Sequence, residues 1–497
     1  MNRVQNLFLI TVLMLTPLSQ VLGSFFDRTT LKTEGKIVDG AVEDLNDDGL
    51  LDVLAVYATE RHPHTRRWLA VFWQQGKRLF DPEPNQIWEV DPGAAILDIG
   101  DISSDPGREI VLMSGDGIHF YGQKNGAFVD EYRKVIETTT IFCLGEDDDL
   151  PTWNFARDIC RNVGDEILIP KFGAIELWSR GEDGAYRLTQ TFPVKMPTRV
   201  SAETPGDNYS YAMRADYRVP KIECKDFNND GSTDVLVCWE DNLNVFLQNR
   251  DGAFRSSPDH EFQLELRTDD ELENDEVELL LSVDDLNGDG YMDIVVNKMK
   301  GGLANAKTET NFYMAHGGNT FRQTPDHFMT ADDAISQPYL VDLDGDNRLD
   351  LIQPEIKMGI KSVVSMLLMK KFNISFLVYL NREEGLFSEE PDFSTKVSFK
   401  LDFTRRGGTA SPLIEFEGDY NGDGRKDLAV GTAEEELSVF FGDRHKVFTN
   451  KPQVVEKVRT SSHAVAKDFD GDGKVELLLY YPDQNELKNR MVLLWPK

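Results

Sequence analysis

The chain has 497 residues, with 86 acidic and 53 basic side chains and a formal net charge of -33 at pH 7. Such an acidic surface repels the phosphates of DNA and RNA, which excludes nucleic-acid binding. Hydrophobic residues make up 40% of the chain and aromatic residues 10%, enough for a sizeable core and too much for intrinsic disorder. The composition therefore predicts a soluble, strongly acidic globular protein.

The first 23 residues are typical of a cleaved signal peptide. Arg3 supplies a positive region, residues 7–18 are apolar, and a small residue, Gly23, precedes the expected cleavage point. Neither this run nor any later one reaches the ~20 uncharged apolar residues that a membrane-spanning helix needs. We therefore expect a secreted or periplasmic protein without a transmembrane anchor, whose mature chain, residues 24–497, is a single domain.

A nine-residue pattern recurs along the mature chain. It has oxygen-bearing side chains at positions 1, 3 and 5, usually Gly at position 6, and a carboxylate at position 9 before a β-branched run. In chain order we number the copies loops 1 to 8. The complete copies are loop 1 (Asp44, Asn46, Asp48, Asp52), loop 4 (Asp226, Asn228, Asp230, Asp234), loop 5 (Asp285, Asn287, Asp289, Asp293), loop 6 (Asp342, Asp344, Asp346, Asp350), loop 7 (Asp419, Asn421, Asp423, Asp427) and loop 8 (Asp468, Asp470, Asp472, Glu476). The degenerate copies are loop 2 (Asp101, Ser103, Asp105, Glu109) and loop 3 (Asp158, Cys160, Asn162, Glu166).

Oxygen ligands at this spacing are typical of calcium sites. Ca²⁺ takes six to eight oxygens at about 2.3–2.6 Å, whereas Mg²⁺ demands near-ideal octahedral geometry. One Asp-rich turn is also common in metal-free hairpins, but repetition of the same register favours a cation. An EF-hand would need Glu at position 12, where the complete copies have Ala55, Val237, Val296, Gln353, Val430 and Leu479. We predict about six Ca²⁺ sites in the complete loops and none in the degenerate ones.

Each loop is followed by a second repeated element, in which an apolar strand, a polar turn with Gly and an aromatic residue follow one another, as in Val245–Phe254. Gly in a short polar loop between apolar runs is a hairpin signal. A loop hairpin and a second hairpin give four strands in roughly 57 residues, which is the size of a propeller blade. The sequence therefore predicts an all-β fold, an eight-bladed β-propeller.

The two ends of the chain are complementary. The eighth unit stops at Lys497 after its third strand, and the mature chain begins with Ser24-Phe25-Phe26, like the Gly-Ala-Phe piece of other units. We expect residues 24 to about 35 to complete the last blade, which would close the ring and remove exposed sheet edges.

Loops of this form, with hairpins that end in Asp-Gly-Ala-Phe as at 251–254, resemble the FG-GAP/VCBS repeat family, which includes the propeller of integrin α subunits. The resemblance covers nearly the whole mature chain. It implies calcium in loops on one face and often an adhesive or ligand-binding role on the other. Eight units rather than seven, and no following stalk domains, depart from the integrin head, so integrin function is not implied.

Four cysteines, Cys143, Cys160, Cys224 and Cys238, fit an oxidising compartment. Four cysteines allow three connectivities. The pairs Cys143–Cys160 and Cys224–Cys238 are local and therefore favoured, and free buried thiols are the alternative.

The ligand is less well determined than the fold. Basic residues gather in segments 61–68, 298–307 and 357–371, which would attract an anionic glycan or acidic partner, unless they only offset nearby carboxylates. The sequence has no HExxH, GxSxG or Walker motif. We predict a non-catalytic binding or adhesion module for an extracellular glycan or protein, and the alternative is a carbohydrate-active enzyme resembling polysaccharide lyases on the same fold.

Overall fold

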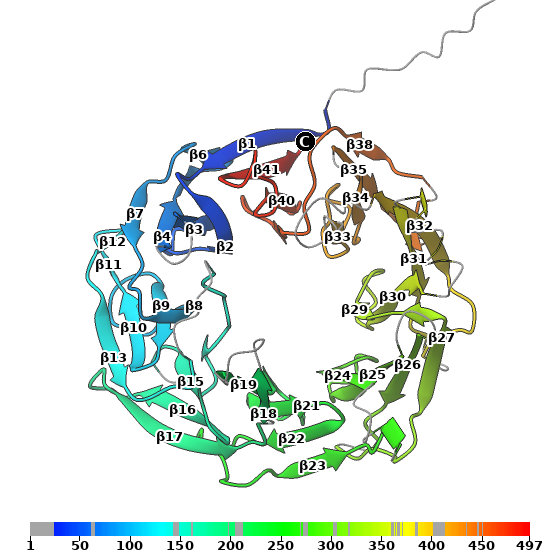
Figure 1. Ribbon diagram of the computed structural model, residues 1–497, viewed down its shortest axis with the longest axis horizontal. Coiled ribbons are helices and arrows are strands. Elements are labelled where there is room, and N and C mark those ends of the chain that lie inside the picture. Colours follow the sequence, from blue (N-terminus) through cyan, green and yellow to red (C-terminus); the bar gives the residue numbers. More distant parts are fainter. Residues whose placement is uncertain are drawn as a thin grey trace, which may run out of the picture.

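The protein forms a ring of eight β-sheets around a central axis in the computed structural model (Figure 1). The structure describes residues 24–60, 65–142, 149–160, 163–196, 198–203, 212–268, 270–271, 277–301, 306–316, 319–358, 362, 364, 368–369, 371–382, 386–400, 413–433, 435–444, 447–449 and 451–497. The predicted signal peptide lies outside these residues. Among them, no helix is long and apolar enough to cross a membrane.

Each of these eight sheets is one blade of antiparallel strands, which follow chain order from the axis outwards except in blade 8, where the N-terminal strand is outermost. From the innermost strand, blades 1 to 4 are β2 (Lys36–Glu43), β3 (Asp52–Thr59), β4 (Arg66–Phe72), β7 (Gln86–Glu89); β8 (Ala94–Gly100), β9 (Glu109–Ser114), β10 (Gly117–Tyr121), β13 (Arg133–Glu137); β14 (Ala156–Arg157), β15 (Glu166–Lys171), β16 (Ala174–Arg180), β17 (Tyr186–Pro193); and β20 (Lys221–Lys225), β21 (Asp234–Trp239), β22 (Asn242–Phe246), β23 (His260–Gln263).

Blades 5 to 8 follow the same plan. They are β24 (Val277–Asp284), β25 (Asp293–Lys300), β26 (Lys307–Tyr313), β27 (His327–Asp332); β28 (Ala334–Ile335) with β29 (Tyr339–Val341), β30 (Asp350–Lys357), β31 (Lys371–Tyr379), β32 (Phe393–Lys400); β33 (Ile414–Glu415), β34 (Leu428–Ala433), β35 (Glu436–Phe440), β38 (Val454–Glu456); and β39 (Ala464–Lys467), β40 (Glu476–Tyr480), β41 (Arg490–Pro496), β1 (Phe26–Lys32). The predicted eight-bladed propeller is therefore confirmed.

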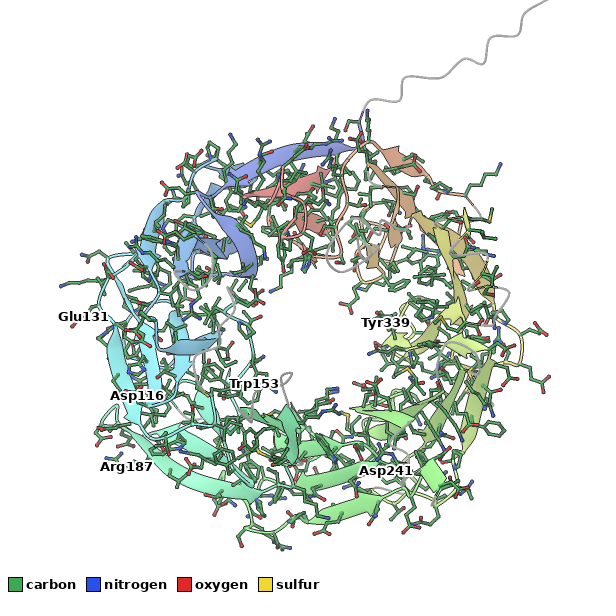
Figure 2. All side chains as sticks on the ribbon, in the orientation of Figure 1. Asp116, Glu131, Trp153, Arg187, Asp241 and Tyr339 are labelled. Carbon is green, nitrogen blue, oxygen red and sulfur yellow. The ribbon has the colours of Figure 1, made fainter. Side chains whose placement is uncertain are left out.

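The second strand of each blade is the apolar run that follows a loop. In β3 every residue except the last is buried, because neighbouring blades cover both faces of the strand. Charged side chains lie on the outer rim, as Glu131 and Arg187 show, whereas Tyr339 and Trp153 lie nearer the axis (Figure 2). The core is thus a series of clusters between adjacent blades.

The N-terminal strand β1 lies in the last blade, where the sequence analysis placed it. It pairs with β41 in antiparallel register from Phe26 opposite Pro496 to Lys32 opposite Arg490. Phe26 and Leu31 are buried, with 2% and 0% of their surface exposed. The first and last strands of the described chain therefore share one sheet.

The Gly-containing second hairpins differ from the prediction. Only in blade 3 and in the composite blade 8 does the aromatic residue, Tyr186 or Phe26, begin the fourth strand. Elsewhere the aromatic closes a small separate hairpin, and the fourth strand follows several residues later; the small hairpins with named strands are β5 (Gln74–Gly76) with β6 (Leu79–Phe80), β11 (Gln123–Lys124) with β12 (Ala127–Phe128), and β36 (Gly442–Asp443) with β37 (Val447–Phe448). The physical reason is packing. Phe80, for example, is buried against Phe469 and Trp495 of blade 8, which locks blade 1 to its neighbour.

The predicted disulfide between Cys224 and Cys238 is wrong. Cys224 lies opposite Val235 and Cys238 opposite Lys221 on strands β20 and β21, so the two side chains are offset along the strands and lie on opposite faces of the sheet. Both are free thiols, and so is Cys160, whereas Cys143 lies outside the described residues. Burial raises the pKa of Cys238 to about 12, which makes its thiol inert.

An insertion between blades 3 and 4 forms a two-stranded ribbon, β18 (Thr198–Glu203) with β19 (Ala212–Tyr217). At its end the exposed ring of Tyr217 packs edge-on against exposed Phe172 of the β15–β16 turn, with 4.9 Å between ring centroids. The insertion therefore presents an aromatic pair beside blade 4.

Asp98 in β8 joins blade 2 to the short innermost strand of blade 3. Its Oδ2 accepts hydrogen bonds from the backbone N–H groups of Phe155 (2.6 Å) and Ala156 (2.8 Å). Burial nevertheless raises the pKa of Asp98 to about 6. Because this pKa lies above that of the unfolded chain, its contribution to stability is present at pH 4 and is lost as the pH rises through 6.

We expect Asp98→Asn to flatten this pH dependence. Between pH 4.5 and 7.5 the free energy of unfolding should fall by about 2 kcal/mol less in the variant than in the natural protein, since Asn does not ionise. Urea unfolding at both pH values measures this difference. Asp251→Asn, on the exposed turn of blade 4, is the matched control, and an equal slope in all three proteins would contradict the assignment.

Candidate metal loops and the opposite face

All eight loops lie on one face of the ring. In every blade the loop connects the innermost strand to the second strand, as loop 1 connects β2 to β3 and loop 8 connects β39 to β40. Because each blade starts its innermost strand from the other face, the repeated connection emerges on the same side each time. The sequence pattern thus becomes a circle of acidic turns.

The backbone of each complete loop holds the first and fifth side chains in place. In loop 1, Asp44 accepts hydrogen bonds from the N–H groups of Asp48 (3.1 Å) and Gly49 (2.8 Å), and Asp48 accepts one from Leu50 (2.9 Å). Gly49 has a φ of 84°, which explains the usual Gly at position 6. Loops 4, 5, 7 and 8 repeat these bonds, and loop 6 has Asn347 at that position with a φ of 64°.

The carboxylate at position 9 has a structural role that sequence analysis missed. Asp52 is fully buried, and its two oxygens accept hydrogen bonds from the N–H of Leu45 (3.1 Å) at position 2 and of Gln74 (2.9 Å) after the third strand. The same two backbone hydrogen bonds are accepted by Asp234, Asp293, Asp350 and Asp427. Glu109 and Glu166 of the degenerate loops also accept the position-2 N–H. This residue therefore ties the loop to its blade whether or not a cation binds.

Burial of these carboxylates costs free energy when they are charged. Desolvation raises the pKa of the position-9 groups to about 7 in Asp52, Asp293, Asp350 and Asp427, about 6 in Asp234 and about 8 in Glu476, and neighbouring loop aspartates add to the shift. A cation at the loop would offset both causes.

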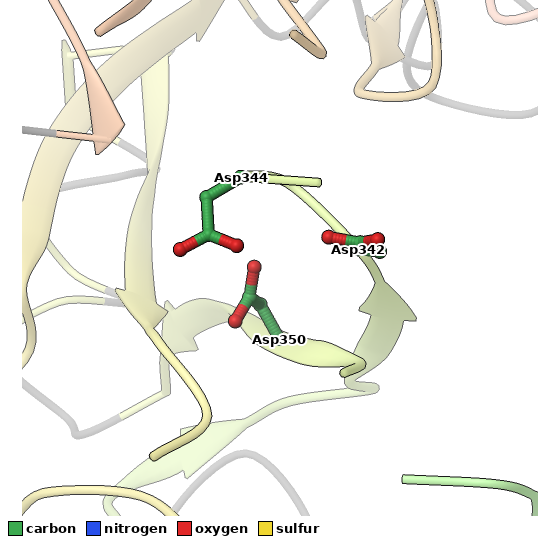
Figure 3. A group of neighbouring side chains, drawn as sticks. All are labelled: Asp342, Asp344 and Asp350. Carbon is green, nitrogen blue, oxygen red and sulfur yellow. The ribbon is translucent and has the colours of Figure 1, made fainter. Parts of the chain in front are cut away.

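Two loops bring three carboxylates to one point. Figure 3 shows Asp342, Asp344 and Asp350 of loop 6, of which one oxygen each lies within 4.8 Å of the others, and Asp468, Asp470 and Glu476 of loop 8 are arranged in the same way. Both loops have Asp at position 3. In loops 1, 4 and 5 that position is Asn, whose amide lies 3.0–3.2 Å from the position-5 carboxylate. These hard oxygen donors fit Ca²⁺.

The degenerate loop 2 has basic partners instead. Arg133 forms an ion pair with Asp105, and Arg180 Nη1 donates a hydrogen bond to the carbonyl oxygen of Ser103 (2.6 Å). In loop 3 the Cys160 thiol lies 3.6 Å from the carbonyl oxygen of Gly252, and Asn162 lies outside the described residues. In loop 2 a guanidinium thus neutralises the position-5 carboxylate.

On the opposite face, a pocket of about 740 Å³ lies between blades 4 and 5, lined by Arg218, Lys221, Trp239, Glu240, Arg267 and neighbouring residues. These residues stand where β20 and β24 begin and where β21 ends, at the ends away from the loops. Arg267 bonds Glu240 (2.9 Å), and Arg218 follows Tyr217 of the exposed aromatic pair.

In the described part of the basic segments, several lysines pair with carboxylates. Lys298 and Lys300 both pair with Glu271 (2.8 and 2.7 Å), Lys307 with Glu309 (2.7 Å), and Lys357 with Glu355 (3.0 Å). The lysines beside Glu271 lower its pKa to about 2 despite the desolvation that raises it. These four lysines are therefore neutralised by nearby carboxylates, whereas residues 61–64, 302–305, 359–361, 363, 365–367 and 370 lie outside the described part.

Comparison with known proteins agrees with this geometry. The sequence model of the family described as FG-GAP-like repeat matches residues 226–296, 285–352 and 419–479, which contain loops 4 to 8. No curated protein matches the chain. Among solved structures, the chain is similar to an Agrocybe aegerita lectin that recognises non-reducing terminal N-acetylglucosamine (14% identity, 95% of both chains covered, TM-score 0.42) and to the Dos1 propeller (9% identity, 95% of this chain and 96% of that one, TM-score 0.42).

A third solved structure is the Nup133 β-propeller domain of Vanderwaltozyma polyspora, with 8% identity, 87% of this chain and 97% of that chain covered, and a TM-score of 0.38. Likenesses this distant carry no argument about function. The matched repeats and the ring of eight blades, taken together, show that the chain is an eight-bladed β-propeller with FG-GAP-like repeats.

Proposed function

We propose that this protein is an exported, calcium-binding propeller that acts as a non-catalytic binding or adhesion module for an extracellular glycan or protein. The observation that carries the proposal is the division of the ring into two faces. One bears the circle of acidic loops, and the other bears the pocket of about 740 Å³ beside an exposed aromatic pair.

Calcium is supported by the donor set of the complete loops. In loops 6 and 8, oxygens of three carboxylates lie within 4.8 Å of one another. In loop 8, Glu476 is fully buried and its Oε1 has no hydrogen-bond partner among the described residues. A buried carboxylate oxygen without a partner is costly, and a hard cation would satisfy it. The calcium is expected to stabilise the ring rather than to take part in chemistry.

Ligand binding is supported by the composition of the opposite pocket. Trp239 and the aliphatic start of β24 supply apolar surface, while Arg218, Glu240 and Arg267 supply charged groups. Pockets that hold small ligands combine apolar walls with a few placed polar groups. The rings of Tyr217 and Phe172, which are 44% and 65% exposed, extend this surface beyond the pocket. A saccharide with a carboxylate would match this surface, because its ring can stack on the aromatic side chains and its charge can pair with an arginine.

A binding screen tests the proposal. We expect the labelled mature protein to be retained, in millimolar Ca²⁺, by a subset of immobilised acidic glycans, and Arg218→Ala with Trp239→Ala to weaken retention at least tenfold. Arg255→Ala, an exposed arginine of blade 4 outside the pocket, is the matched control. If the pocket variant is retained as strongly as the natural protein, the ligand binds outside this pocket. If no glycan or extracellular protein retains the natural protein, the binding function is refuted.

The enzyme alternative finds no support in the group formed by Ser114, Asp116 and His119 in blade 2. Ser114 Oγ lies 3.2 Å from His119 Nδ1 and donates a hydrogen bond to Asp116 (2.6 Å), and Asp116 Oδ1 lies 3.8 Å from His119 Nε2, too far for the carboxylate to hydrogen-bond the imidazole. The His119 ring is only 7% exposed and stacks on Tyr132 with 4.5 Å between centroids. Incubation with the same glycans tests the lyase alternative directly: a binding module yields no unsaturated product absorbing in the near ultraviolet, whereas a lyase does.

A further inference from the structure

Loop 8 contains a cationic side chain that belongs to another blade. Arg78, in the β5–β6 turn of blade 1, donates from Nε to Asp470 Oδ2 (2.7 Å) and from Nη2 to Asp472 Oδ2 (2.8 Å). Its Nη1 donates to the carbonyl oxygen of Pro496 (3.1 Å), and the guanidinium lies 5.7 Å from the Trp495 ring. One residue therefore bridges positions 3 and 5 of the loop and the last strand.

These contacts use the oxygens that a metal would need. Asp470 Oδ1 already accepts the N–H of Asp472 (3.1 Å), and Asp472 Oδ1 accepts the N–H of Lys474 (2.9 Å). The loop backbone thus takes one oxygen of each carboxylate, and the guanidinium takes the other. Because Asp470 is almost completely buried, at 3% exposure, the pair with Arg78 is shielded from solvent on the acidic side.

Glu476 provides a second, independent observation. In loop 1 the corresponding oxygen accepts the N–H of Gln74, and strand registers Val53 with Phe72 and Leu477 with Leu494 place Pro496 where Gln74 stands. Proline has no N–H to donate. This explains why Oε1 of the fully buried Glu476 lacks a partner among the described residues, and why loop 8 retains a demand for a cation even with Arg78 present.

Comparison with the other loops shows what is special about this one. In loops 6 and 7 an arginine at position 7, Arg348 or Arg425, pairs with the position-5 carboxylate of its own loop. In loop 6 that pairing leaves Asp344 at position 3 free to converge with Asp342 and Asp350. Arg78 instead reaches loop 8 from blade 1 and engages both positions. The hydrogen bonds of Arg78 therefore also connect blade 1 to blade 8, at the place where the ring closes.

We propose that Arg78 is a tethered cation that competes with the divalent cation for loop 8. The inference rests on the calcium binding proposed above. When metal is scarce, the guanidinium neutralises the loop and fastens blade 1 to blade 8; when metal is abundant, the ion must displace it from Asp470 and Asp472. Loop 8 is accordingly the weakest of the metal sites, and its occupation changes the contacts at the ring junction.

Equilibrium dialysis against buffered free Ca²⁺, with metal analysis of the protein, tests the competition. At a free Ca²⁺ concentration that fills about five sites of the natural protein, Arg78→Met is expected to bind about one equivalent more, with the weakest site strengthened about tenfold or more. Adding Asp468→Asn should remove that equivalent. Arg348→Met is the matched control, because Arg348 pairs with the position-5 carboxylate of its own loop, and its gain should be smaller.

A second readout covers the metal-free state. In EGTA, Arg78→Met should melt below the natural protein, and the gap should narrow in saturating Ca²⁺. Arg78→Lys, which keeps the charge but cannot bridge two carboxylates, serves if the Met variant fails to fold and should gain part of the added affinity. Unchanged or weakened calcium binding in both variants would overturn the proposal that Arg78 competes with Ca²⁺, but not the proposal that the loops bind Ca²⁺. Absence of bound Ca²⁺ in every protein would overturn the calcium proposal as well.

Discussion

Removal of divalent cations is expected to lower the melting temperature of the mature protein by about 10 °C. At ten times its dissociation constant, one bound ion stabilises the folded state by about 1.4 kcal/mol, so about six ions contribute roughly 8 kcal/mol. For a chain of this size 1 kcal/mol corresponds to about 1–2 °C. Burial raises the pKa values of the position-9 carboxylates to between about 6 and about 8, so their charge at neutral pH is expected to destabilise a ring without bound cations.

Calorimetry in excess EGTA, and then in millimolar Ca²⁺ or Mg²⁺, measures this effect, and metal analysis should find about six equivalents. Mg²⁺ should restore much less of the loss, because it tolerates irregular coordination poorly. Asp342→Asn in loop 6 should remove about one equivalent, whereas Asp101→Asn in the degenerate loop 2 should leave the stoichiometry unchanged. If the melting temperature is the same in EGTA as in Ca²⁺ and no metal is bound, the loops are acidic turns without a cation.

Loss of the N-terminal strand is expected to have the second large effect. Without residues 24–32, the seven-residue edge of β41 would be unpaired, and buried Trp495 would be uncovered. Exposed edges of this kind pair with other chains. We therefore expect the truncated protein to associate or aggregate, which sedimentation or light scattering detects, and to lose its cooperative melting transition.

A milder pair of variants separates strand packing from strand deletion. Leu31→Ala removes a fully buried side chain of β1 and should cost about 2–5 kcal/mol of unfolding free energy. Asp27→Ala, in the same strand, removes only an ion pair between Asp27, 65% exposed, and Lys497, and should cost under about 1 kcal/mol. Equal losses in the two variants, or a monomeric truncated protein of normal stability, would show that β1 does not hold the ring closed.

The repeat made most of the fold predictable. A nine-residue motif followed by a β-branched strand is a local signal, and its recurrence fixes the number of blades independently of any single copy. The complementary ends of the chain, Phe26 at one and Lys497 at the other, likewise indicate which blade is composite. The converging carboxylates of loop 6, Asp342, Asp344 and Asp350, could be named from the sequence, since all of them lie within one turn of chain.

The errors arose where packing between blades decides the structure. The aromatic of the Gly-containing hairpin, such as Phe80, was predicted to begin a fourth strand, but it is buried against blade 8 and the strand starts later. Cys224 and Cys238 flank one loop in the sequence, yet strand register places them on opposite faces. Alternation along a strand depends on which residues are paired, and spacing alone does not give that register.

The sequence by itself determined the all-β repeat, its eight units and the oxygen donors of each loop, because these depend on residues close together in the chain. The tertiary structure decided what surrounds those donors. It buried Glu476 beneath a proline that cannot donate a hydrogen bond, and it brought Arg78 from the first blade to Asp470 in the last. No local pattern encodes such contacts, since they exist only once the ring has closed and placed the two ends of the chain side by side.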